Sequence, residues 1–532
     1  MKRKIHIATF DIETDPFLKN RVPRPFCCGF YDGIQSRTWW GANCLDQFIA
    51  WIKVQSIKYT IYAHNGGKFD FIYLLRAGHL SNPLKLINSS ISQANFYGHE
   101  LRDSLKILPF SLDTYKKDKI DYQKFELDHR ENFKEEILEY LEADCRYLHE
   151  IVSAFIERFG MSLTIGSTAL KELRKFHPFE RRKKFFDENF RQYFFGGRVE
   201  CLTKNNINKG NFKVYDVNSM YPHTMSSFNH PAGRYTTFTN QFENIDHLID
   251  REGVCKHGEI YFATIEATSI GALPVRYKDG ISFPHTTGEF FACSHEIKTA
   301  IKLGLLKIHK IKKLHVFWGV QKFNEFVNKF IDEKQNSPKK STNYIFAKLI
   351  LNSAYGKFAQ NPENYFDCFI VGGQEDKPKD MQLFADYGTF EIWRRKAECQ
   401  FFNDVSIAAS ITSAARSVLL DAIFKAKNPL YCDTDAIICE SLEVEHDEYK
   451  LGAWKEEACG DIFYLAGKKM YALYNSKHVP KYVKLASKGV RLTGDEIKAL
   501  SKGAVIECEF DAPKFKLDGR DVFIKRKVKS RL

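Results

Sequence analysis

The sequence predicts a multidomain protein that combines an α/β part with an α+β part. Its 532 residues are enough for several hydrophobic cores, and 44% apolar with 27% charged residues is typical of a soluble globular chain. Strand-like and helix-like patterns alternate over the first 170 or so residues, as in α/β folds. Beyond residue 200 the pattern changes to a strand, long helical stretches and turn-rich segments.

Two strands and one long helix are expected in the N-terminal part. Residues 5–10 and 58–63 alternate apolar and polar side chains, which predicts strands. Residues 134–158 repeat apolar side chains near a 3.6-residue period, which predicts an amphipathic helix. A basic and aromatic stretch follows at residues 181–198, and we place a domain boundary near residue 190.

The C-terminal part is expected to begin with a strand at residues 212–217, followed by an irregular region to about residue 320. A helical stretch covers residues 321–358 and is interrupted by polar residues and a proline at 335–338. Residues 365–400 are rich in turn formers. A helix of small residues is expected at 404–426, and a hairpin around Asp433 comes after it.

Composition suggests a polyanionic partner and a reducing compartment. The net charge is +13 although 66 acidic residues are present, so the positive excess is spread over a mixed surface. Aromatic residues make up 14%, and those not in the core could stack on bases. Thirteen cysteines lack a CxxC pair, which indicates free thiols in a cytosol. We recognise no signal peptide and no transmembrane run, and expect no membrane partner.

One set of acidic residues lies in the N-terminal part. Asp11 and Glu13 are two apart and share a strand face, and Asp70 follows the second strand. Tyr140 and Asp144 are four apart on one helix face. Each residue alone could be a turn residue, a helix cap or a surface charge. Together they could hold two metal ions and orient a water for phosphodiester hydrolysis.

A second set lies around Asp216, Asp433 and Asp435. Two carboxylates about 4 Å apart repel each other by roughly 4 kcal/mol at an effective dielectric near 20, so such a group needs a cation. In two-metal phosphoryl transfer, Asp216 and Asp435 are the candidates for bridging both ions, with Asp433 more peripheral. The carbonyl of Val217 would complete the triphosphate-bound ion. Tyr221 could lie under the incoming sugar and exclude a 2′-hydroxyl.

A basic helix face would complete this second site. Lys348, Asn352 and Tyr355 follow i, i+4, i+7 spacing. Lys348 would meet the triphosphate, Asn352 would contact it, and Tyr355 would pack on the nascent base pair, with room left by Gly356. Lys340 is expected on about the same face as a further phosphate contact. Alone, a lysine is more often a solvated charge and a tyrosine more often core.

These segments resemble the motifs of family B DNA polymerases. Residues 10–14, 65–70 and 140–144 resemble the three exonuclease motifs of the family's RNase H-like proofreading domain. The resemblance implies metal binding by Asp11, Glu13, Asp70 and Asp144, and a water oriented by Tyr140. It also implies that Asn65 and Phe69 hold the frayed 3′ end of DNA.

The C-terminal segments resemble the family's three polymerase motifs, although Ala436 stands where many relatives have serine. Lys468-Lys469-Met470-Tyr471 resembles the lysine-x-tyrosine motif, which implies that Lys469 and Tyr471 contact primer phosphates. Phe194-Phe195-Gly196-Gly197 resembles the Tyr-x-Gly-Gly template motif with phenylalanine at its first position. The resemblance implies DNA binding by Phe194, Gly196 and Gly197.

The spacing of the motifs is similar to that of the protein-primed branch, and the whole chain most resembles tectivirus polymerases. Residues 62–70, 216–223 and 348–364 carry this resemblance. Residues 103–108 and 117–120 resemble exonuclease motifs of the same branch, which implies single-stranded DNA binding by Ser104 and Leu105 and help in hydrolysis from Lys117.

The resemblance implies a right-hand polymerase behind an exonuclease domain. The expected domains are the exonuclease (1–190) and the polymerase (191–532). Within the polymerase we expect the palm (191–225 and 401–480), a terminal-protein-docking insertion (about 226–330), the fingers (about 331–362), a DNA-encircling insertion (about 365–400) and the thumb (about 481–532).

The implied cofactor is Mg²⁺, two ions per active site, with Mn²⁺ as a substitute. The implied partners are template and primer DNA, dNTPs, a terminal-protein primer and a single-stranded DNA-binding protein, in the cytoplasm of a bacterial host. Two alternatives stay open: a nuclease whose C-terminal half only binds DNA, and a nucleic-acid-primed polymerase of the same family.

Overall fold

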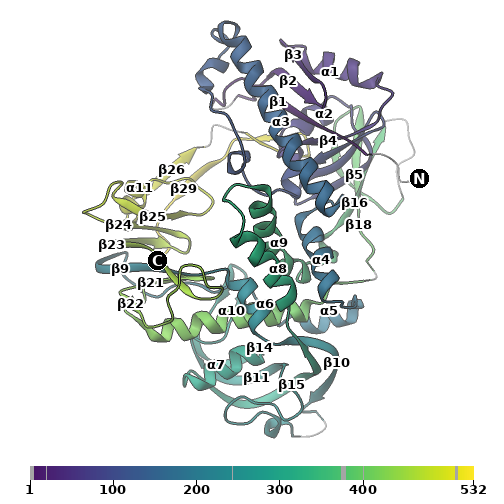
Figure 1. The fold of residues 1–532 in the computed structure, drawn as a ribbon. Helices are drawn as coiled ribbons and strands as arrows, with labels where there is room; N and C mark the ends of the chain where they lie inside the picture. Colours follow the sequence, from purple (N-terminus) through teal and green to yellow (C-terminus); the bar gives the residue numbers. More distant parts are fainter. Residues whose placement is uncertain (1–4, 19–20, 242–243, 373–378, 400, 510–512) are drawn as a thin grey trace.

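Three β-sheets surround a central group of helices. The structure, a computed structural model, describes residues 5–18, 21–241, 244–372, 379–399, 401–509 and 513–532. In Figure 1 the N-terminal sheet lies at the top right, a four-stranded sheet at the bottom and a seven-stranded sheet at the left. The helices between them are α3 (Lys134–Phe159), α4 (Ile165–Phe176), α8 (Asn324–Gln335) and α9 (Thr342–Phe358).

The N-terminal sheet has ten strands. Its centre pairs β1 in parallel with β4, and β4 in parallel with β7, whereas β2 runs antiparallel to β1. The strand order is β17 (Gln382–Asp386), β18 (Phe390–Lys396), β16 (Phe366–Gly372), β5 (Ser81–Ile87), β6 (Ser90–Phe96), β7 (His99–Asp103), β4 (Tyr59–Ala63), β1 (His6–Thr14), β2 (Pro25–Tyr31) and β3 (Ser36–Trp40). The predicted strands at 5–10 and 58–63 are confirmed as β1 and β4.

The predicted helix at 134–158 is confirmed as α3, which packs on β1 and β2. It ends where Gly160 takes φ 74°, a conformation that favours glycine. Phe155 and Phe159 pack against Phe346 of α9, with ring centroids 5.3 and 5.9 Å apart. The helices before and after residue 190 therefore share one hydrophobic core. Two shorter helices, α1 (Cys44–Lys53) and α2 (Asp70–Arg76), join strands of the N-terminal sheet.

The region predicted to be irregular, up to residue 320, consists largely of strands and helices in its described residues, which exclude 242–243. It forms the four-stranded sheet in the order β10 (His230–Thr239), β15 (Leu306–Gln321), β11 (Tyr261–Ile270) and β14 (His285–Cys293), with helix α7 (Ser294–Lys302) and the hairpin β12 (Val275–Tyr277) and β13 (Gly280–Ser282). Register shifts at Thr264/Ile265 and Glu266/Ala267 interrupt the two-residue alternation. This interruption hid the strands from the sequence pattern.

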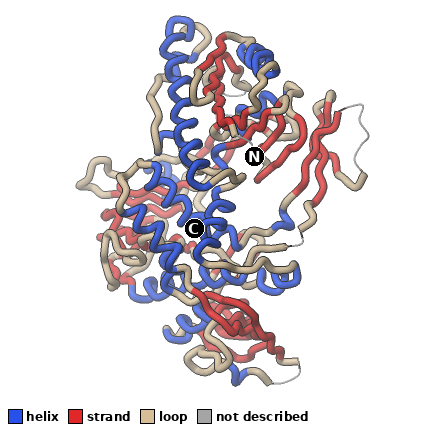
Figure 2. The backbone as a smooth tube through the Cα atoms, turned by 45° about the vertical axis from the view of Figure 1, so that its right-hand side comes forward, coloured by secondary structure: helices blue, strands red, loops and turns tan. Residues whose placement is uncertain are grey.

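The predicted turn-rich segment 365–400 also contains strands in its described parts, 365–372 and 379–399. β16 and β18 pair along seven positions, and β16 joins the N-terminal sheet at Cys368, opposite Leu84 of β5. The amide of Asn82 adds two hydrogen bonds to the backbone of Ile370, at 2.7 and 2.9 Å. Figure 2 shows these strands standing beside the N-terminal sheet, although they come almost 300 residues later in the chain.

The seven-stranded sheet is built around a long central strand. Its order is β25 (Tyr482–Ser487), β24 (Met470–Tyr474), β23 (Trp454–Gly467), β9 (Ile207–Val217), β21 (Ala436–Cys439), β20 (Tyr431–Asp433) and β8 (Val199–Cys201). The predicted strand at 212–217 and the Asp433 hairpin are confirmed within it. Two further helices, α5 (Lys184–Arg191) and α6 (Met220–Ser227), flank the strands that enter this sheet.

Helix α10 (Val405–Lys425) confirms the helix predicted at 404–426, and it packs against α7, α5 and α6. Contrary to the expectation from the sequence, it is long and apolar enough to cross a membrane, alone among the helices of the described residues. However, 78% of its most apolar window is buried inside the protein, as in a core helix. Its small residues allow other helices to pack closely on it, and an apolar sequence suits this buried position.

The C-terminal segment returns to the N-terminal sheet. After helix α11 (Gly494–Ser501), β26 (Ile506–Glu509) pairs with β29 (Lys525–Val528), and the short strands β27 (Lys514–Phe515) and β28 (Asp521–Val522) form a hairpin between them. Arg76 of α2 forms an ion pair with Asp521, at 2.7 Å, and Tyr387 donates a hydrogen bond to the carbonyl of Leu517, at 2.7 Å. The hairpin is thus fixed to both the N-terminal helix α2 and the 365–400 strands.

Candidate active sites

The first candidate site lies where β1 meets α3. One carboxylate oxygen from each of Asp11, Glu13 and Asp144 lies within 4.8 Å of the others, a spacing that could hold a metal ion. Asp11 and Glu13 point the same way because they are two residues apart on one strand. Asp144 reaches them because α3 crosses that strand.

Asp70 lies beside this cluster but outside it. It begins helix α2, is 2% exposed, and accepts a hydrogen bond from the amide of Ile12 at 3.1 Å. The Ile12 amide lies between Asp11 and Glu13 in the chain, so it ties Asp70 to the same strand. The structure therefore unites three of the four predicted metal ligands and holds the fourth against their backbone.

Burial and mutual repulsion disfavour the ionised form of these carboxyl groups, so a cation would stabilise them. Burial, with the charge of Asp144 next, raises the pKa of Asp11 to about 7. Burial also raises the pKa of Glu13 and of Asp70, and the charge of Asp11 adds to both shifts. Lys117 donates to Asp144 Oδ2 at 2.9 Å, while Asp144 Oδ1 is buried with no hydrogen-bond partner among the described residues. An all-oxygen group with an unpartnered buried atom is a fit for a hard divalent cation.

Tyr140 lies one helical turn before Asp144 and is largely buried. Its hydroxyl is 3.3 Å from that of Tyr122, and burial raises the pKa of Tyr140. A neutral phenol keeps its proton, so it can donate a hydrogen bond. Lys117 lies over the Tyr140 ring, 5.4 Å from its centroid. Both predicted helpers of hydrolysis are therefore next to the cluster.

A cavity of about 1020 Å³ opens onto this cluster, and Asn65 and Phe69 line it as predicted. Ser104 and Leu105 are not among its lining residues. Ser104 is fully buried, and its hydroxyl contacts His64 Nδ1 at 3.0 Å and the carbonyl of Ala63 at 3.1 Å. The predicted contact of Ser104 with DNA would therefore be indirect, through His64.

The C-terminal hairpin forms part of the cavity wall, which the sequence did not predict. Phe515 stacks on Phe69 with centroids 5.8 Å apart, and Arg76 lies over Phe515 at 4.9 Å. Phe515 is more than 400 positions away from Phe69 and Arg76 in the chain. The only sign of Phe515 in the sequence is its place as an aromatic residue in a basic stretch, and many such residues are present.

The second candidate site lies on adjacent strands of the seven-stranded sheet. Asp216 of β9 pairs with Ala436 of β21, and the amide of Val217 donates to the carbonyl of Asp435 at 2.8 Å. Thr434, which lies between Asp433 and Asp435 in the turn, takes φ 59°. The fold therefore brings together the two strands that carry the predicted metal-bridging pair.

Burial and neighbouring carboxylates raise the pKa of both Asp435 and Asp216. Burial, then the charge of Asp216, raises the pKa of Asp435 to about 6. Burial, then the charge of Glu457, raises the pKa of Asp216. However, in the part of the chain that the structure describes, Asp216, Asp433 and Asp435 do not reach the close spacing of the first cluster, and lysines form ion pairs with two of them. Lys455 lies 3.5 Å from Asp216, and Lys469 lies 2.8 Å from Asp433.

The sequence did not predict the ion-paired residues Lys455, Glu457 and Lys484 at this site. Lys455 bridges Asp216 and Glu457, and Lys484 forms a further ion pair with Glu457, at 2.5 Å. Lys455 and Glu457 are two apart on β23, and this spacing could have shown that they share a face. Lys469, the predicted primer contact, forms an ion pair with Asp433. Tyr471 is 7% exposed and packs against Tyr431, with centroids 4.8 Å apart.

Helix α9 presents the predicted lysine face. Lys348 and Asn352 are exposed, and Tyr355 is half-buried. The ring of Tyr355 stacks on that of Tyr221, with centroids 3.8 Å apart and planes 19° apart. Tyr221 therefore lies between the acidic turn and α9, where the sugar-selecting role was predicted. A side chain added at Gly356 would meet open space.

The prediction for Lys340 is wrong in its geometry. Ser341 accepts a hydrogen bond from the amide of Tyr344 and caps α9, so the helix begins only at Thr342. Lys340 lies before the cap with φ 70° and shares no helical face with Lys348. Burial lowers the pKa of Lys334 of α8, and the charges of Lys348 and Lys455 add to the shift.

The Phe194–Gly197 loop packs against the acidic turn. A Cβ on Gly197 would lie 2.7 Å from Thr434 Oγ1, and the amide of Thr434 donates to the carbonyl of Arg198 at 2.7 Å. Phe194 is half-buried. Tyr193 is buried, and its hydroxyl contacts Thr264 at 2.9 Å, so it cannot replace the tyrosine of the related motif.

The comparisons with known proteins identify the family. A family model described as "DNA polymerase type B, organellar and viral" matches residues 113–445. The chain therefore belongs to the type B DNA polymerases of organelles and viruses.

Within that family, the chain is 42% identical over 567 residues to the DNA-directed DNA polymerase of Enterobacteria phage PRD1, covering 99% of this chain and 98% of the relative. It is 26% identical to the DNA polymerase of Bacillus phage phi29, covering 86% of this chain and 84% of the relative. The phi29 polymerase solved with primer-template DNA has the same fold, with a TM-score of 0.75 at 20% identity, over 99% of this chain and 100% of that one. The predicted resemblance to protein-primed family B polymerases is confirmed.

Proposed function

We propose that this protein replicates a linear DNA genome from a terminal-protein primer and removes misincorporated nucleotides from the 3′ end. The observation that carries the synthetic role is the carboxylate pair Asp216 and Asp435 on adjacent strands, with Tyr221 beyond Asp216 stacked on Tyr355 of the lysine-bearing helix α9. The distinct Asp11, Glu13 and Asp144 cluster supports the trimming role. A full-length relative is named a DNA-directed DNA polymerase.

Both sites fit Mg²⁺, because their donors are carboxylate and carbonyl oxygens. Asp216, Asp435 and the carbonyl of Val217 would hold the ions for synthesis. Two ions, when bound, would lower the charge on the triphosphate and help to deprotonate the attacking hydroxyl or water. Mn²⁺ has the same oxygen preference and could replace Mg²⁺.

The protein's own residues would orient the substrates. Lys348 and Asn352 would bind the triphosphate of the incoming dNTP, since both are exposed on one face of α9. Tyr221 would close the sugar pocket on one side, held by its stack on Tyr355. Lys469 would exchange its ion pair with Asp433 for a primer phosphate.

At the trimming site, Asn65 and Phe69 would hold the unpaired 3′ end in the cavity. Tyr140 would position the attacking water through its hydroxyl, and Lys117 would stabilise charge beside Asp144.

Two inserted regions support protein priming and processive synthesis. The four-stranded sheet, within residues 226–330, would dock the terminal protein. The 365–400 strands touch the C-terminal hairpin through Tyr387 and Leu517, and would help to enclose the DNA. A single-stranded DNA-binding protein would protect the displaced strand, and the site of action would be the cytoplasm of a bacterial host.

Primer extension with Mg²⁺ and dNTPs tests the proposed function. We expect wild-type protein to extend a primer, and Asp435→Ala to stop extension while single strands are still degraded. A wild-type protein that degrades but never extends would favour the nuclease alternative. Deleting residues 226–330 should abolish initiation on protein and spare some DNA-primed extension. Equal loss of both would count against a special role of residues 226–330 in protein priming.

A further inference from the structure

A buried ion pair joins helix α10 to the four-stranded sheet. Arg416 of α10 donates from Nε to Glu296 Oε1 at 2.7 Å and from Nη2 to Oε2 at 2.8 Å. Both side chains are 2% exposed. Glu296 is in the first turn of α7, the helix that covers the four-stranded sheet. Burying two charges is costly, so such a pair contributes less to stability than its contacts suggest.

The same guanidinium holds the backbone of the Phe194–Gly197 loop. Its Nη1 donates to the carbonyl of Phe195 at 2.6 Å and to that of Gly196 at 2.8 Å. Arg416 thus satisfies four acceptors with one planar group. A lysine cannot do so, because its three donors diverge from a single nitrogen.

The loop in turn fixes the acidic turn. Gly197 packs tightly on Thr434, and Val199 of β8 pairs with Asp433 of β20. The amide of Thr434 also donates to the carbonyl of Arg198. A shift of the Phe195 and Gly196 carbonyls would therefore displace Thr434, which lies between Asp433 and Asp435.

We infer that Arg416, held by Glu296, is a positioning residue that couples the four-stranded sheet to the template loop and to the acidic turn of the synthetic site. This inference rests on the proposed function, because it assigns Arg416 to the geometry of DNA synthesis. The path from α7 to the turn runs from Glu296 to Arg416, from Arg416 to the backbone of the Phe194–Gly197 loop, and from Gly197 to Thr434. The four-stranded sheet is thus an integral part of the synthetic site as well as the proposed docking platform.

Three variants separate positioning from simple folding. Arg416→Lys and Glu296→Gln disturb the pair. The double variant Arg416→Met with Glu296→Leu removes both buried charges, a change that often preserves stability, but it also removes the hydrogen bonds to the loop. The readouts are kcat and KM for dNTP addition to a primer, and the rate of 3′ trimming of single-stranded DNA by the same preparations.

We expect kcat for dNTP addition to fall at least about tenfold in all three variants, since a misplacement near 1 Å can cost a hundredfold. KM for dNTP should change little because the α9 face is untouched. Trimming should remain at the wild-type rate because the first cluster lies on another sheet. The control Lys312→Gln breaks exposed ion pairs to Glu266 and Glu289 on the same four-stranded sheet, and should change neither activity.

Three results would overturn the inference: unchanged kcat in Arg416→Lys and Glu296→Gln, wild-type synthesis by the double variant, or synthesis and trimming lost together in every variant. The last result would mean that the pair only supports folding. If wild-type protein fails to extend a primer, the proposed function fails instead, which is a separate outcome.

Discussion

Replacing Asp435 by asparagine is expected to stabilise the metal-free protein although it stops synthesis. Burial and the charge of Asp216 raise the pKa of this carboxyl from 3.8 to about 6. Each pKa unit corresponds to about 1.36 kcal/mol, so the ionised group costs the folded state about 3 kcal/mol. Asparagine has nearly the same shape and carries no charge, so the variant avoids this cost.

The sign of the effect depends on pH. Because the folded pKa lies above the unfolded one, the neutral carboxyl favours the folded state at low pH. The wild-type protein is therefore as stable as the variant below about pH 4, loses stability progressively as pH rises through about 6, and remains lower above that. The difference between Asp435→Asn and wild type should open over this window and then stay constant.

Thermal unfolding in EDTA at pH 4, 5 and 8 measures this difference. About 3 kcal/mol corresponds to a rise of several degrees in Tm for a domain of 150–250 residues. Adding Mg²⁺ at pH 8 should raise the Tm of the wild type more than that of the variant, since an ion that binds only the folded state stabilises it.

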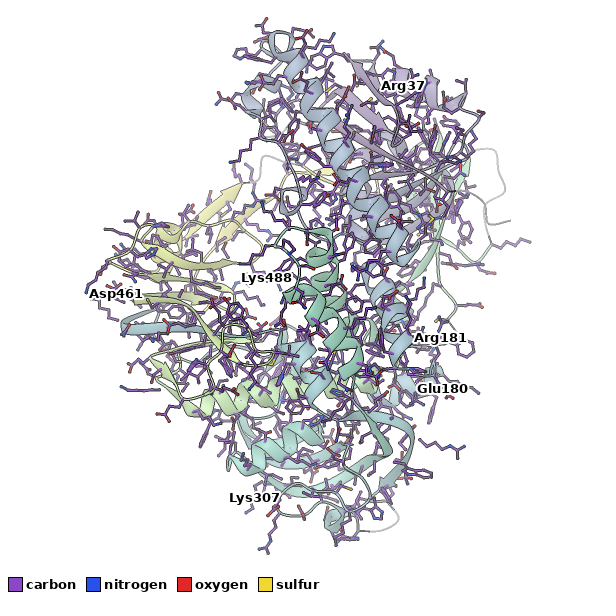
Figure 3. The ribbon with its side chains drawn as sticks, viewed as in Figure 1. Arg37, Glu180, Arg181, Lys307, Asp461 and Lys488 are labelled. Atoms are coloured by element: carbon purple, nitrogen blue, oxygen red, sulfur yellow. The ribbon has the colours of Figure 1, made fainter. Side chains whose placement is uncertain are left out.

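The matched control is Asp461→Asn on strand β23 of the same sheet. Figure 3 labels Asp461 on the left-hand side of the seven-stranded sheet. A hydrogen bond from Ser476 lowers the pKa of Asp461, so its asparagine variant should be slightly less stable than wild type. If Asp435→Asn is no more stable than wild type at pH 8 in EDTA, the cost assigned to the buried charge of Asp435 does not exist.

Three further outcomes are expected. Asp11→Ala combined with Asp70→Ala should abolish 3′ trimming in a gel assay and leave primer extension intact; normal trimming would disprove the metal assignment. Tyr221→Val should raise incorporation of ribonucleotides relative to dNTPs, and unchanged sugar selectivity would exclude Tyr221 as the selecting residue. Phe515→Ala should raise KM for single-stranded DNA in trimming more than it lowers kcat, because the residue lines the cavity without touching the carboxylates.

The local acidic motifs were predictable because their chemistry is set by neighbours in the chain. Asp11 and Glu13 share a strand face by spacing alone, and Tyr140 and Asp144 share a helix face. The long helix α3 was equally visible from its apolar period. In each case the residues that produce the pattern are close to one another in the chain.

Contacts between distant segments were not predictable. Arg416 and Glu296 are 120 residues apart, and either residue alone reads as a surface charge. The strands of residues 230–321 were hidden by bulges, and β15 carries lysines that mask its buried face. Lys340 was misplaced because the cap at Ser341 outweighs the helical spacing. Tertiary packing and capping decide these features, and pattern periodicity does not record them.

The late addition of β16 to the N-terminal sheet bears on how the chain matures on the ribosome. Until residue 372 has been synthesised, β5 is the outermost strand on one side of the N-terminal sheet, without the Cys368–Leu84 pairing and the Asn82–Ile370 hydrogen bonds that later hold β16 to it. An open strand of this kind readily pairs with other nascent chains. A fragment ending near residue 190 would lack these contacts permanently, so we expect it to self-associate more than the full chain does.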